Sequence, residues 1–82
     1  MAIAELITLM ERFVSGDAIS VAAANRLEGL LLELVPEHPE FEELADELAQ
    51  YRPEGGDYLH DFEWMKPRVA HHLAALRAPR PL

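Results

Sequence analysis

Residues 2–36 read AIAELITLMERFVSGDAISVAAANRLEGLLLELVP, and this stretch contains two amphipathic segments joined by a short polar turn. Gly16 follows the first segment directly, where a left-handed C-terminal cap is expected. Ser20 can cap a second helix through its hydroxyl, with Asp17 as a rival cap, and Pro36 stops that helix. One face of a first helix, over about residues 2–15, is indicated by the spacing of Ile3, Leu6, Ile7, Met10, Phe13 and Val14.

Two further helices are expected after Pro36. Pro39 suits the first turn of a third helix, and residues 52–56 form a turn by composition. A last helix should end near Arg77, with Pro67 either in its first turn or kinking a longer helix. We expect Pro67 to lie in the first turn, because the apolar residues of segment 57–63 do not recur at a helical spacing. Buried faces are predicted at Phe41, Leu44, Leu48 and Tyr51, and then at Phe62, Met65, Val69, Leu73 and Leu76.

The chain has 82 residues, half of them apolar, and no cysteine. This length corresponds to one domain with a thin core, which no disulfide can brace. We therefore predict an all-α protein, a small four-helix up-and-down bundle over residues 1–78, with a flexible tail over 79–82 that contains Pro79 and Pro81.

Charge is distributed unevenly along the chain, whose formal net charge is −8. Residues 33–63 contain eleven acidic side chains against Arg52 alone, which gives −10, whereas residues 64–82 carry +4. Direct nucleic-acid binding is not expected, because phosphate contacts require a basic surface. A basic protein partner is the natural complement of such a surface. The alternative is that the charge only keeps the protein soluble.

Catalytic and metal-binding residues are not evident. His71 and His72 are adjacent and would diverge by about 100° on a helix, so they cannot share one ion. Asp57, His60 and Asp61 would share a face if their segment were helical, but a metal site requires three or four supported ligands. We expect no catalytic residue, no metal and no cofactor, and hence a protein that is not an enzyme.

Aromatic side chains gather within the acidic third of the sequence, where they can anchor a partner that the charge attracts. Phe62 is expected in the core, whereas Tyr58 and Trp64 are as well explained by an interface as by packing. The predicted partner-binding residues are Glu43, Asp46, Glu47, Glu54, Asp57, Tyr58, Asp61 and Trp64.

The location of the protein is predicted from its apolar segments. Acidic and basic residues such as Glu5, Arg26 and Glu33 interrupt every apolar stretch before it is long enough for a bilayer. No basic region precedes the first apolar residues, so a signal peptide is not expected. We therefore expect a cytoplasmic protein that does not bind membranes.

Residues 9–16, LMERFVSG, followed by Ile19 and Ser20, resemble the opening of the colicin D immunity protein family. Its members often begin with an amphipathic helix, a Phe-x-x-Gly turn and an Ile-Ser that starts the second helix. The acidic helix ending near Tyr51 and the closing helix are also similar in layout. The turn at residues 16–20 is one residue longer here, and the second helix is rich in alanine and leucine where aromatic residues are more usual.

The resemblance implies a four-helix bundle that binds and inhibits a toxin. Toxins of this kind cut transfer RNA and carry a basic cleft, which an acidic inhibitor occupies as a mimic of RNA phosphates. Our hypothesis is therefore an acidic inhibitor of a basic partner, which under the resemblance would be a tRNA-cleaving toxin domain. The alternative is a structural or regulatory module that forms a homodimer through its Ala/Leu-rich second helix. The salt dependence of binding separates the two.

Overall fold

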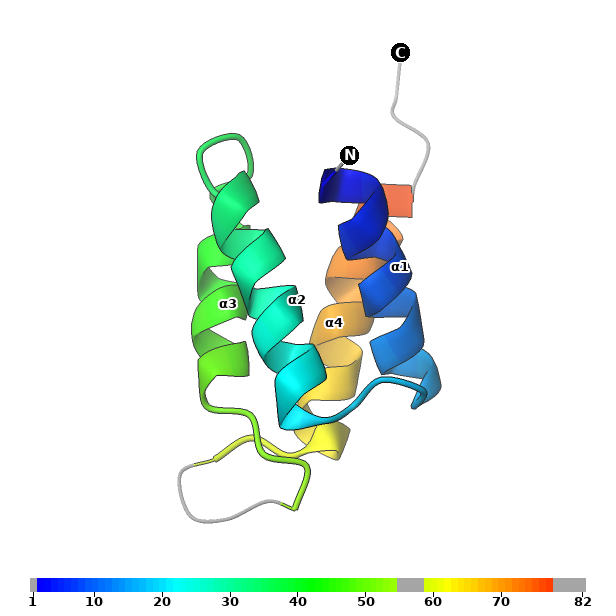
Figure 1. Cartoon of the computed structure of the whole chain (residues 1–82). Coiled ribbons are helices and arrows are strands. Elements are labelled where there is room, and N and C mark those ends of the chain that lie inside the picture. Colours follow the sequence, from blue (N-terminus) through cyan, green and yellow to red (C-terminus); the bar gives the residue numbers. More distant parts are fainter. Residues whose placement is uncertain (1, 55–58, 78–82) are drawn as a thin grey trace.

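Four helices form the protein in a computed structural model that describes residues 2–54 and 59–77. They are α1 (Ala2–Ser15), α2 (Val21–Leu34), α3 (Phe41–Ala49) and α4 (Phe62–Arg77). Successive helices run in opposite directions, and α4 returns to pack beside α1 (Figure 1). The predicted all-α up-and-down bundle is confirmed. The tail predicted for residues 79–82 lies outside the described residues.

The turn between α1 and α2 is formed by two local caps. Gly16 has φ 88°, a left-handed conformation that favours glycine, and the Asp17 amide donates to the Arg12 carbonyl at 2.9 Å. Ser20 is the N-cap of α2, because its Oγ accepts a hydrogen bond from the Ala23 amide at 3.1 Å. Both predicted caps are confirmed, and the cap is Ser20 rather than its rival Asp17.

Helix α3 begins later than predicted. Pro39 lies in the turn that precedes the helix, where its carbonyl accepts from the Glu42 amide at 3.2 Å. Beyond the end of α3, Tyr51 is fully buried, and its hydroxyl donates to the Ile19 carbonyl at 2.7 Å. Burial, and then the negative charges of Glu54 and Asp61, raise the pKa of Tyr51. The hydroxyl therefore remains a donor and ties this loop to the α1–α2 turn.

Helix α4 begins at Phe62, so Pro67 lies inside the helix and not in its first turn. The placement expected from the sequence was wrong because Asp61 provides an earlier start. Its carboxylate accepts from the Trp64 amide at 2.9 Å, and its carbonyl accepts from the Met65 amide at 3.0 Å. Pro67 has no amide proton and cannot donate to the Glu63 carbonyl, so the helix tolerates one missing hydrogen bond there.

One continuous core fills the space between the helices. Phe13 of α1 contacts both Tyr51 and Phe62, with ring centroids 5.3 and 5.5 Å apart. Two backbone hydrogen bonds close the loop before α4, from the Arg52 amide to the His60 carbonyl and from the His60 amide to the Gln50 carbonyl.

Across residues 2–54 and 59–77, no helix combines the length and the apolar character needed to cross a membrane.

Candidate functional site

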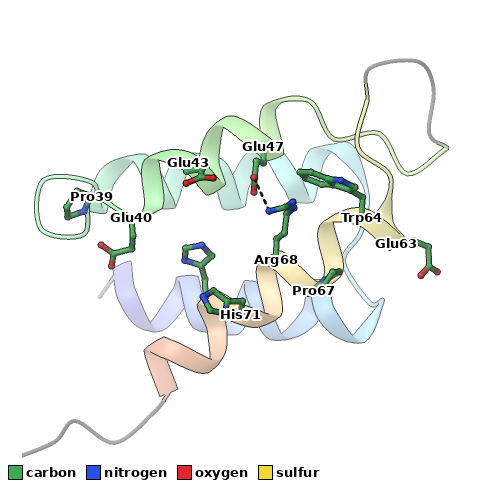
Figure 2. A pocket seen from close by; sticks show the side chains of 10 residues that line it. Pro39, Glu40, Glu43, Glu47, Glu63, Trp64, Pro67, Arg68 and His71 are labelled. Atoms are coloured by element: carbon green, nitrogen blue, oxygen red, sulfur yellow. Dashed lines mark ion pairs between the residues drawn. The ribbon is translucent and has the colours of Figure 1, made fainter.

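An open groove of about 810 Å³ runs between α3 and α4. These two helices pack against each other less extensively than the other neighbouring pairs do, which leaves room for side chains of both to face the groove (Figure 2). The groove is lined by Pro39, Glu40, Glu43, Glu47, Glu63, Trp64, Pro67, Arg68, His71 and His72.

The helical repeat explains why α3 presents a row of carboxylates to the groove. Glu40, Glu43 and Glu47 are spaced by three and four residues and therefore share one face, while Phe41, Leu44 and Leu48 of the same segment are buried in the core. Figure 2 shows the three glutamates along the α3 side, opposite side chains of α4. The acidic side of the groove thus follows from the amphipathic pattern of α3.

The α4 side of the groove is built around Trp64 and Arg68, which are four residues apart and lie on the same face. The Arg68 guanidinium carbon lies 3.9 Å from the centre of the Trp64 ring. Its Nη1 atom is 3.3 Å from a carboxylate oxygen of Glu47, so the ion pair connects α4 to α3 (Figure 2). The His60 and Trp64 rings stack almost parallel, with their centroids 3.6 Å apart.

The groove carries more negative than positive charge. Four glutamates line it, and Arg68 is the permanent cation among its lining residues. Glu47 is paired with Arg68, and Glu40 lies 3.4 Å from Nδ1 of His38. With neutral histidines the lining has a formal charge of −3 (four glutamates against one arginine), so it favours cationic groups of a binding partner.

The groove also holds a histidine with a shifted pKa. Burial, and then the charge of the neighbouring His71, lower the pKa of His72, while Glu40, Glu47 and Glu43 oppose the shift. His72 packs edge-on against Phe41, with the ring centroids 6.1 Å apart. At neutral pH the imidazole is therefore uncharged, and it lines the groove without adding to its charge.

Acidification is expected to destabilise the fold through His72. Because the pKa of His72 is lower in the folded state, its imidazole is protonated more readily in the unfolded chain than in the folded one. Its contribution to stability is constant at neutral pH and falls as the pH drops below 6.5 through the folded-state pKa. Urea unfolding at pH 7.5, 6.0 and 5.0 should show a smaller loss of stability for His72→Gln than for wild type. Equal losses would contradict this assignment.

The structure brings three of the predicted partner-binding residues together in the groove, namely Glu43, Glu47 and Trp64. Asp46 and Glu54 are exposed, but neither lines it. Asp61 caps α4, which gives its carboxylate a structural role. Asp57 and Tyr58 lie outside the described residues. The groove therefore contains three of the eight residues predicted to bind a partner, and the binding role of all eight stays a prediction.

Several groove residues were not predicted from the sequence. They lie on α4 or before α3, and what they share is that they line the same groove as Glu43 and Glu47. A helical projection of residues 62–77 could have found part of this set, because Trp64, Arg68 and His71 share a face. The residues that were missed are Pro39, Glu40, Glu63, Pro67, Arg68, His71 and His72.

Metal-ligating residues do not gather in the described part of the chain. Over residues 2–54 and 59–77, no three His, Asp or Glu side chains are placed to hold one ion. The grouping of Asp57, His60 and Asp61 considered above cannot be assessed as a whole, because Asp57 lies outside those ranges. Within them, Asp61 caps α4 and His60 stacks on Trp64.

The apolar face of α2 is mostly directed into the core. Leu27, Leu30 and Leu31 are buried there, and Leu32 is the large apolar side chain of α2 that is exposed, by 49%. Self-association through α2 would thus depend chiefly on Leu32, and a single exposed leucine is ordinary for a protein surface. Stable dimers bury roughly 800 Å² on each partner, far more than one leucine provides.

Comparisons with known proteins found no matching family model, no matching curated protein and no matching solved structure.

Proposed function

We propose that this chain is an acidic helical binding protein that holds a basic segment of another protein in the groove between α3 and α4. The observation that carries the proposal is the groove itself, in which Glu40, Glu43 and Glu47 form a row along the α3 side and Trp64 lies on the α4 side near Glu47 (Figure 2). Carboxylates attract and orient a cationic segment, and a half-buried aromatic residue holds it after contact.

Inhibition of the basic partner is the second part of the proposal. Its support is the concentration of negative charge in residues 33–63, together with the likeness of residues 9–20 to the opening of colicin D immunity proteins. An acidic groove that covers the basic cleft of a nuclease takes the place of the RNA phosphates. We therefore propose an immunity protein, and a nuclease-type toxin encoded beside this chain would support that proposal.

Binding of a cationic peptide tests the groove directly. A fluorescein-labelled octapeptide, Lys-Gly-Arg-Gly repeated twice, supplies four positive charges. Trp64 is the only tryptophan in the chain, so its emission reports on the groove while peptide anisotropy reports on binding. Between 20 and 200 mM salt the Debye length falls from about 20 Å to about 7 Å, and affinity should fall about tenfold or more.

The control is an octapeptide in which glutamate replaces every lysine and arginine. It should not bind at either salt concentration. The proposal fails if the basic peptide leaves Trp64 emission unchanged at 20 mM salt, or if its affinity is independent of salt.

A further inference from the structure

We infer that the groove recognises an arginine side chain of the basic partner, and that Arg68 occupies the arginine's place in the free protein. This inference rests on the proposed function, because it specifies which cationic group the groove binds. It assigns to Arg68 the role of an internal competitor that the partner displaces.

The contacts of Arg68 are those that recognise a guanidinium group. Its guanidinium lies over the Trp64 ring at 3.9 Å, and its Nη1 is 3.3 Å from the Glu47 carboxylate. A planar cation gains from the face of an aromatic ring and from a carboxylate at its edge at the same time. The parallel His60 ring, 3.6 Å from Trp64, holds the indole in the orientation that such stacking needs.

The two sides of this site differ in how firmly they are held. The Glu47 side chain is only 17% exposed, whereas that of Arg68 is 45% exposed. Arg68 can therefore turn into solvent while Glu47 stays in place. Exposed ion pairs contribute little to stability, so an incoming arginine finds a site that is already arranged and meets a weak competitor.

Further carboxylates extend the site along α3 toward Glu40. Glu43 lines the groove one turn before Glu47, and it forms no ion pair with another residue in the described ranges. Its charge is available to a second basic residue of the partner, or to Arg68 after displacement. The groove thus suits a segment with an arginine followed by further cations.

Lysine does not satisfy the same site equally well. Its ammonium group is a compact, strongly hydrated charge that cannot stack as a plane on Trp64 or offer Glu47 the two parallel donors of a planar fork. Two octapeptides of equal charge separate these chemistries, one alternating arginine with glycine and the other alternating lysine with glycine. The arginine peptide should bind about threefold or more tightly, as a stacked cation does.

Substitution of Arg68 tests the competitor role. Arg68→Gln removes the guanidinium that covers Trp64 and should raise the affinity for the arginine peptide about two- to fivefold, with a smaller gain for the lysine peptide. Arg77→Gln is the matched control. It removes the same charge from the same helix, but Arg77 pairs with Glu11 of α1, away from the groove.

The titrations, read by peptide anisotropy at 20 mM salt, give distinguishable outcomes. An arginine preference together with a gain confined to Arg68→Gln supports the inference. Equal binding of the two peptides, or equal gains for Arg68→Gln and Arg77→Gln, overturns the arginine site while leaving an acidic groove that binds cations. If neither peptide binds wild type or either variant, the proposed function fails as well.

Discussion

Phe13→Ala is expected to destabilise the bundle by about 3–5 kcal/mol, the usual cost of removing a buried phenylalanine ring. Phe13 is 1% exposed and contacts the rings of Tyr51 and Phe62. It therefore joins α1 to the loop after α3 and to the start of α4. A domain of this length has a total stability of roughly 4–12 kcal/mol, so this loss is a large fraction of the total.

Urea unfolding followed by circular dichroism at 222 nm measures the effect. Leu32→Ala is a suitable control, because this side chain is 49% exposed and its truncation should change stability by about 0.5 kcal/mol or less. A loss below about 1 kcal/mol for Phe13→Ala would contradict the central position of this ring in the core.

The first two helices were predictable because their limits are set locally. Gly16 adopts the left-handed conformation and Ser20 accepts the capping hydrogen bond, and neither depends on distant residues. The start of α4 was not predictable from periodicity. Its cap, Asp61, lies in a polar segment that carries no helical pattern, so Pro67 was placed too near the beginning of the helix.

The candidate site was only partly predictable for a related reason. Sequence analysis found the acidic residues of α3, because their charges are adjacent along the chain. The groove requires α4 to lie beside α3, and only that packing brings Arg68 to 3.3 Å from Glu47. A search for acidic and aromatic residues alone could not find an arginine or two histidines as part of the same surface.

Neutralising the α3 carboxylates should have the largest effect on binding. Glu40→Gln, Glu43→Gln and Glu47→Gln, made together, remove three charges from the groove and should weaken the mixed Lys/Arg octapeptide at least about tenfold at 20 mM salt. Asp61 is left unchanged because it caps α4. Glu47→Gln also frees Arg68 from its ion pair, which leaves an unopposed positive charge in the groove and lowers affinity further.

A matched triple variant separates local recognition from net charge. Asp17→Asn, Glu28→Gln and Glu33→Gln also remove three charges, but none of these residues lines the groove or takes part in an ion pair within the described ranges. Both variants have the same net charge and should retain the helical content of wild type. Long-range attraction is therefore reduced equally in the two proteins, and any difference between them arises in the groove.

The direct test of a cation-binding groove is the peptide affinity of these two triple variants, measured side by side by anisotropy at 20 mM salt. We expect the groove variant to lose about tenfold or more, and the control variant to stay within about twofold of wild type. Equal losses in the two variants would show that the peptide responds to overall charge alone, and would contradict a binding site between α3 and α4.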